Sequence, residues 1–184
     1  AILFAGFPGF GGAEALANML KGDVNPSGKL SFSYPATHLH HVPYYHKPSE
    51  KYFLDYQKVP QSLYPFGHGL SFTQFRYQNL TIDRHSLTQD GRIKARVEVT
   101  NIGKRDGKEA VLWYIRDHTG SITRPVKQLK HFEKRRIQKG RTEIFEFTID
   151  KRHLSYPDKQ GNTVLEAGDF TLMVGDQEII FSLE

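Results

Sequence analysis

Alternation of apolar and polar side chains governs the chain from Gln78 to its C-terminus. Apolar residues recur in five runs, at 93–99, 111–115, 145–149, 170–174 and 179–183. A side-chain period of two is typical of strands that bury one face of a sheet. Turn-forming residues separate these runs, at 101–107, 119–125, 139–140, 159–162 and Asp176. About 105 residues of this kind predict a seven-stranded β-sandwich, immunoglobulin-like or fibronectin type III-like, over residues 78–184.

The first 35 residues have a different organisation. Their apolar spacing and turn residues predict a strand, a glycine-rich turn, a helix, a tight turn and a second strand, over Ile2–Ala5, 6–12, 13–20, 23–28 and Leu30–Tyr34. Gly22 stands where a C-cap glycine is expected. This order predicts the C-terminal piece of an α/β sandwich domain over residues 1–35. A protein seldom begins inside a buried strand, so we expect the chain to be the C-terminal portion of a longer one.

The glycine-rich turn at 6–12 has two interpretations. A glycine-rich loop between a strand and a helix can bind phosphate. The turn has neither the P-loop pattern nor a clean GxGxxG, and no complete βαβ unit with an acidic partner follows it. We therefore favour glycines that let the helix and the strand pack closely.

Residues 36–61 are rich in histidine and tyrosine. The histidines are His38, His40, His41 and His46, and the tyrosines are Tyr44, Tyr45, Tyr52 and Tyr56. A histidine cluster can bind zinc or copper, but helical spacing and a nearby carboxylate or thiolate are both missing here. We favour a loop lined with histidine and aromatic side chains over a metal site. Such rings also stack on sugar faces at the rim of a pocket.

The stretch SLYPFGHGLSFT, residues 62–73, joins the two unlike parts of the chain. Pro65 fixes φ, while Gly67 and Gly69 permit backbone angles that other residues avoid. The mixture is neither helical nor strand-like, and its aromatic residues predict a loop buried against other structure. We expect residues 36–77 to form an aromatic linker between residues 1–35 and the sandwich.

Composition excludes some classes of site and leaves others open. Cysteine is absent, which excludes disulfides and thiolate metal sites. No apolar run approaches the roughly 20 residues of a membrane-spanning helix.

The formal net charge of +5 is spread along the chain and does not demand a polyanion partner. The basic segment 127–136 is best interpreted as a solvated strand and turn, although it can also contact a polyanion. Asn79-Leu80-Thr81 is a glycosylation sequon.

Several motifs, in order, resemble glycoside hydrolase family 3, the β-glucosidase and β-xylosidase family. The matching stretches are AILFAGFPGFGGAEALANMLKGDVNPSGKLSFSYP, SLYPFGHGLSFTQF, VEVTNIGKRDGKEAVLWYIRD, TRPVKQLKHFEK and LEAGDFTLMVG. The last three resemble the C-terminal fibronectin type III-like domain of that family. The resemblance covers nearly the whole chain. One departure is Phe10-Gly11, where members often carry Glu or another polar residue, so any contact made by this loop is in doubt.

The resemblance implies an accessory role for this chain. Family members have a TIM-like barrel, then an α/β sandwich, then the fibronectin-like domain. They are retaining enzymes, with an Asp nucleophile in the barrel and usually a Glu acid/base in the α/β sandwich, both upstream of this chain. Retention needs two carboxylates about 5–5.5 Å apart. No motif pairs Asp23, Asp117, Asp158 or Asp169 with a second carboxylate, so we assign no catalytic residue, no substrate-binding residue, no metal ligand and no cofactor.

We therefore expect the C-terminal segment of a retaining β-glycosidase that is inactive alone. Its expected partners are the upstream barrel and α/β sandwich, and carbohydrate through the whole enzyme. We expect neither a nucleic acid partner nor a membrane span, and a homo-oligomer stays open. His68 and Tyr64 can reach a substrate-entry rim, but packing between domains is the favoured role. The family implies a periplasmic or secreted location. The alternative is a free-standing carbohydrate- or polymer-binding module.

Overall fold

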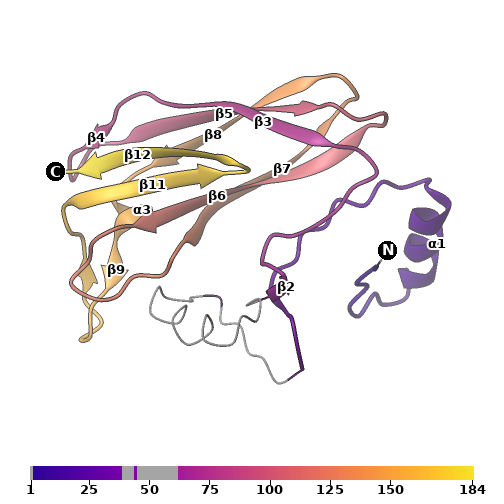
Figure 1. Cartoon of the computed structure of the whole chain (residues 1–184), viewed down its shortest axis with the longest axis horizontal. Helices are drawn as coiled ribbons and strands as arrows, with labels where there is room; N and C mark the ends of the chain where they lie inside the picture. The colour runs from indigo at the N-terminus through magenta and orange to yellow at the C-terminus, as the bar shows by residue number, and fades with distance from the viewer. Residues whose placement is uncertain (1, 39–43, 45–61) are drawn as a thin grey trace.

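The C-terminal two thirds of the chain form a two-layer β-sandwich (Figure 1). The computed structural model describes residues 2–38, 44 and 62–184. One layer has the strand order β4-β12-β11-β6-β7 and the other has the order β3-β5-β8. Their bounds are β3 Phe75–Ile82, β4 Ser86–Leu87, β5 Ile93–Asn101, β6 Gly107–Asp117, β7 Gln128–Ile137, β8 Thr142–Ile149, β11 Gly168–Val174 and β12 Gln177–Leu183. Seven of these are long, as the alternation predicted, and the mainly β fold class is confirmed.

The period of two reappears as strict alternation of burial. In β5 the side chains of Ile93, Val97 and Val99 are fully buried, while Lys94 and Arg96 between them are exposed. Antiparallel pairing sets Val97 opposite Phe145 of β8, and both side chains point into the core. The core lies between the two layers and is formed mainly by large residues of both, among them Trp113, Phe145, Phe181, Ile137 and Leu172.

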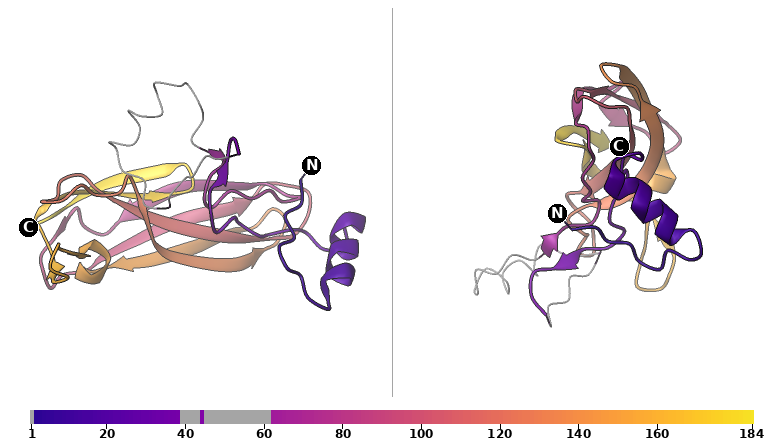
Figure 2. Two further views of the ribbon diagram at one scale, coloured as in Figure 1. Left: turned by 90° about the horizontal axis from the view of Figure 1, so that it is seen from below. Right: turned by 90° about the vertical axis from the view of Figure 1, so that its right-hand side faces the viewer.

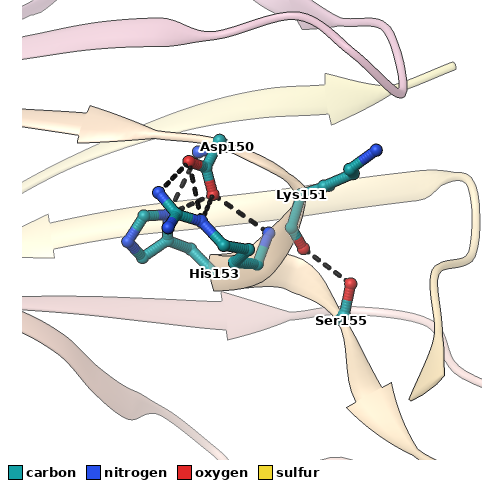
Figure 3. Close-up of polar contacts among 5 residues, drawn as sticks. Asp150, Lys151, His153 and Ser155 are labelled. Atoms are coloured by element: carbon teal, nitrogen blue, oxygen red, sulfur yellow. Dashed lines mark hydrogen bonds and ion pairs between the residues drawn. The ribbon is translucent and has the colours of Figure 1, made fainter. Parts of the chain in front are cut away.

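Small elements close the end of the sandwich that lies near the C-terminus. They are α3 Lys151–Leu154, β9 Tyr156–Pro157 and β10 Thr163–Val164. Asp150 caps α3, because its carboxylate accepts the Arg152 amide at 3.0 Å and its own amide donates to His153 Nδ1 at 3.1 Å (Figure 3). Hydrogen bonding to Arg152, helped by its positive charge, lowers the pKa of Asp150 to about 2, so the cap is ionised at neutral pH.

The N-terminal part contributes one helix and two short strands. These are α1 Gly12–Lys21, β1 Tyr34–Pro35 and β2 Ser62–Tyr64. The predicted helix is confirmed, and Gly22 ends it in the left-handed conformation with φ 83°. Helix α1 projects beyond the end of the sandwich opposite the C-terminus, as Figure 1 and the left view of Figure 2 show.

Two predicted strands differ from the structure. Residues 2–5 form no strand, because a strand needs a neighbour for its backbone groups and the described part of the chain offers them none. The strand predicted over Leu30–Tyr34 is reduced to β1, two residues at its far end. The histidines predicted as an aromatic loop or metal site lie outside the described residues, except His38.

Candidate functional site

The junction segment 62–73 packs against residues 28–35, which precede it in the sequence. We call these two segments together the clasp. Tyr64 of β2 pairs with Tyr34 of β1 in antiparallel register. The Leu30 amide donates to the His68 carbonyl at 2.8 Å, and the Gly67 amide donates to the Leu30 carbonyl at 2.8 Å. These bonds tie residues 30–35 to the segment that enters the sandwich. The prediction of a segment without strand character was wrong at β2, because pairing with β1 makes these three residues a strand.

Two positions of this segment require glycine because other atoms approach their Cα closely. A Cβ added to Gly69 would lie 2.2 Å from the Gly28 carbonyl oxygen. Gly67 has φ +82°, and its added Cβ would lie 2.8 Å from both Leu112 Cδ1 and the Tyr114 hydroxyl. The first contact brings the junction against the 23–28 turn, and the second brings it against the outer side of β6.

Gly69→Ala is expected to destabilise the chain by about 1–3 kcal/mol. The added methyl group clashes with the Gly28 carbonyl oxygen, which can move away only if the paired backbone of the clasp moves with it. Gly28→Ala is the matched control, since its added Cβ meets nothing within 4 Å. Thermal unfolding of the two variants measures the difference. Equal midpoints for the two variants would show that the clasp is loose.

Asn25 links three segments that are far apart in sequence. Its Oδ1 accepts from the Ser71 hydroxyl and from the Phe72 amide, both at 2.8 Å. Its Nδ2 donates to the Asp106 carbonyl at 3.0 Å. The turn after α1, the junction segment and the β5–β6 loop therefore meet at one amide side chain.

Asn101, at the end of β5, satisfies every polar group of its side chain while fully buried. Its Oδ1 accepts from Thr73 Oγ1 at 2.7 Å and from the Gly103 amide at 3.1 Å. Its Nδ2 donates to the carbonyls of Arg105 and Ile137 at 2.8 and 3.0 Å. This side chain holds the end of the junction segment against the β5–β6 loop.

A partly buried ion pair adds a third link between the two parts. Lys29 Nζ lies 3.1 Å from Glu109 Oε1, and the side chains are 22% and 7% exposed. The Tyr77 hydroxyl donates to the same carboxylate oxygen at 2.9 Å. Burial and the Glu109 charge raise the pKa of Tyr77, so the phenol stays protonated and can donate.

Aromatic rings surround the clasp. Tyr64 stacks on His68 with ring centroids 4.9 Å apart, and the centroid of the Tyr34 ring lies 6.2 Å from that of Tyr64. Phe66 contacts Tyr44 and Tyr114 edge-on, at 5.0 and 6.5 Å. Burial raises the pKa of Tyr114 to about 12. Tyr64 and His68 were predicted for an interdomain or rim position. They stack on each other within the clasp.

The expected burial of the junction segment is only partly correct. Leu63, Leu70 and Phe72 are 53%, 77% and 50% exposed, whereas Phe66 is partly buried against the sandwich. The segment packs on one side and leaves its other side open.

The candidate carboxylates are engaged in structural contacts. Asp23 forms an exposed ion pair with Lys21 Nζ at 3.1 Å. Asp117 pairs with Arg124 at 3.0 Å. Asp158 accepts the amides of Gln160 and Asn162, both at 2.8 Å, and Asp169 stands in β11. The part of the chain that the structure describes holds no group of three or more potential metal ligands.

Sequence reasoning missed Asn25 and Asn101. The sequence places Asn25 only in a turn and Asn101 only at the start of one. The available signal was a polar residue at the end of an apolar strand, which predicts a side chain that needs buried partners.

The described residues between 2 and 72 form no core of their own. Within the described part of this range, only Gly12 is fully buried. By contrast, the buried apolar residues that form the core all lie between Leu87 and Leu183. Large apolar side chains that face solvent near α1 include Phe4, Phe7 and Phe10, at 59%, 105% and 112% exposure. Exposed apolar side chains gathered in this way are typical of an interaction surface.

Comparison with known domains divides the chain into two matches. Residues 1–72 match the glycosyl hydrolase family 3 C-terminal domain, and residues 109–178 match a fibronectin type III-like domain. The clasp falls at the end of the first match, and the strands β6 to β11 fall in the second.

Similar full-length proteins include a periplasmic beta-glucosidase of Salmonella typhimurium, 37% identical over 95% of this chain and 24% of its own length. The thermostable beta-glucosidase B of Acetivibrio thermocellus is 37% identical over 88% of this chain and 23% of its own length. The chain therefore spans about a quarter of the length of these relatives.

Solved structures give the same result. A β-glucosidase from Erythrobacter marinus superposes with a TM-score of 0.87 at 34% identity, covering 94% of this chain and 24% of the other. A beta-glucosidase from Listeria innocua in complex with glucose superposes with a TM-score of 0.84 at 31% identity, covering 94% of this chain and 26% of the other.

Among the described residues, no helix is long and apolar enough to cross a membrane.

Proposed function

This chain carries the C-terminal domains of glycoside hydrolase family 3, and we propose that they serve as the accessory and structural segment of a retaining β-glycosidase. The substrates of that enzyme are β-glucosides or related oligosaccharides, and its catalytic carboxylates lie upstream of this chain. The beta-glucosidase names of the similar proteins support the substrate class. The periplasmic relative supports a periplasmic or secreted location.

The observation that carries the proposal is that the described residues between 2 and 72 form no core and expose many apolar side chains. Thirteen of the seventeen large apolar residues that are exposed in the described part lie in this range, although it holds fewer residues than the sandwich. A segment that exposes this much apolar surface is stable only when another surface covers it. We infer that the upstream α/β sandwich covers it and that residues 2–5 become a strand of that sheet.

The proposed division is an α/β sandwich piece over 1–35, a linker over 36–77 and a fibronectin type III-like sandwich over 78–184. The contacts of Asn25, Lys29 and Asn101 support a mechanical role for the clasp. They fix the direction in which the N-terminal piece leaves the sandwich, so the sandwich buttresses the domain that docks on this piece.

Association with separately produced upstream domains tests the docking surface. Phe4→Ser is expected to weaken this association by tenfold or more, because it removes the apolar contact of one large side chain, worth about 1.5–3 kcal/mol. Ile180→Ser is the control, because Ile180 is equally exposed, 58% against 59%, but lies in β12.

Isothermal titration calorimetry gives both dissociation constants. A Phe4→Ser variant that binds as tightly as the unmodified chain, or an Ile180→Ser variant that loses binding equally, would place the docking surface elsewhere.

A further inference from the structure

Two turns at the end of the sandwich opposite the C-terminus gather positive charge (Figure 1). One is the β5–β6 turn with the start of β6, residues 104–108, and the other is the end of β7 with the β7–β8 turn, residues 134–141. These thirteen residues hold eight lysine and arginine side chains and one carboxylate, a net formal charge of +7. Because the whole chain carries only +5, folding concentrates its positive charge at this end.

Printed contacts hold the two turns side by side. The Asp106 carboxylate accepts from the Arg136 guanidinium at 2.8 Å and from the Lys139 amide at 2.9 Å. The Asn101 amide, just before the first turn, donates to the Arg141 carbonyl in the second at 3.0 Å. The carboxylate of this region is therefore already engaged, and the cations of both turns share one end of the fold.

Most of these cations are free to bind an anion from outside. Arg105, Arg135 and Arg136 have partners within the fold. The other five have exposed side chains that make no hydrogen bond or ion pair with any described residue, and they are Lys104, Lys108, Lys134, Lys139 and Arg141.

Like charges face each other across β6 and β7. Lys108 lies directly opposite Arg136, and two residues further along β7 Lys134 lies opposite Ala110. Directly opposite residues point to the same face of a sheet, and like charges there are destabilising. Asp106 compensates Arg136 alone. A local conflict of this kind is expected at a functional site, and an anion over this face would supply the missing counter-charge.

An exposed aromatic ring continues the row of charges. Phe132 is 64% exposed and precedes Lys134 and Arg136 in β7 at intervals of two, so the three side chains follow one face at spacings of about 7 Å. No other phenylalanine, tyrosine or tryptophan of residues 75–184 is exposed. We call Phe132, Lys134, Arg136 and Lys108 the basic stripe.

We propose that the basic stripe binds an acidic polysaccharide, a chain of sugar rings that carry carboxylate groups. The three cations pair with carboxylates, and the Phe132 ring stacks on a sugar face. This inference rests on the proposed function, because a carbohydrate substrate for the whole enzyme favours a sugar polymer over other polyanions. Binding at the stripe would hold the glycosidase on a polymer without using the catalytic domains.

Titration calorimetry of the unmodified chain with polygalacturonate tests the proposal. We expect saturable binding that weakens as sodium chloride rises from about 0.01 to 0.15 M, because the Debye length falls from about 30 to about 8 Å. The methyl ester of the same polymer keeps the sugar rings and loses the charge, and it should not bind measurably.

Two double variants of equal charge locate the site. Lys108→Gln with Lys134→Gln is expected to raise the dissociation constant by about tenfold or more. Lys94→Gln with Lys159→Gln removes two exposed lysines outside the stripe and should change it by less than about twofold. Phe132→Ser should weaken binding without changing its salt dependence, because it removes a ring and no charge.

Absence of binding to polygalacturonate at low salt, or equal binding of its methyl ester, would overturn the proposal, and neither comparison needs a variant to fold. Equal losses in the two double variants, or unchanged affinity in Phe132→Ser, would also overturn it. Single-stranded DNA combines negative charge with stacking bases, so tighter binding of DNA would replace the sugar polymer with a nucleic acid. The measurement needs no turnover, so its failure leaves the glycosidase proposal standing, and an inactive longer polypeptide would leave the binding result standing.

Discussion

Replacing Asn101 with alanine is expected to lower the free energy of unfolding by about 3–4 kcal/mol. The substitution removes four hydrogen bonds at once, to Thr73 Oγ1, the Gly103 amide and the carbonyls of Arg105 and Ile137. Because the site is fully buried, water does not replace them all, and several backbone groups lose their partners.

Urea unfolding followed by tryptophan fluorescence measures this loss. Trp113 is the single tryptophan and is fully buried in the core, so its signal reports on the sandwich. Asn162→Ala is the control, because Asn162 is exposed and its side chain makes one bond, to Asp158. It should change stability by less than about 0.5 kcal/mol. A loss below about 1 kcal/mol for Asn101→Ala would show that the β5–β6 loop does not depend on this side chain.

The sandwich was predictable from sequence because its physics is local and repetitive. In each strand, the alternation of apolar and polar residues shows which side faces the core. The alternation over 93–99 is enough to place Val97 and Val99 inside and Arg96 outside, and the structure confirms it. The helix was equally predictable, from its spacing and from Gly22 at its end.

The strand expected over residues 2–5 illustrates the limit of such reasoning. Apolar composition predicts that a segment will be buried, but a strand also needs a neighbouring backbone. Phe4 meets Phe32 edge-on at 5.3 Å and is otherwise largely exposed. A local pattern cannot reveal whether the required neighbour is present in the same chain.

The clasp was located by sequence, but its bonds were not predicted. Proline and glycine in residues 62–73 predict an irregular backbone between two unlike parts. They do not predict that Gly69 lies against Gly28 or that Asn25 binds Ser71. Those contacts join residues more than forty positions apart, and no local property encodes their partners.

The second large effect concerns catalysis. The isolated chain is expected to show no glycosidase activity, because retaining hydrolysis needs two carboxylates about 5–5.5 Å apart on either side of the bond. Asp117 is neutralised by Arg124, and Asp158 accepts two backbone amides. Burial raises the pKa of Asp117, but its carboxylate pairs with Arg124, and among the described residues neither aspartate makes a contact with a second carboxylate.

Hydrolysis of an aryl β-glucoside, measured on the purified chain beside a polypeptide that also carries the upstream domains, tests the central claim most directly. We predict turnover by the longer polypeptide and none above the buffer rate by the chain alone, a difference of about 10⁶-fold or more. Turnover that rises with the concentration of the isolated chain would contradict the account, because it would place the catalytic carboxylates within these 184 residues.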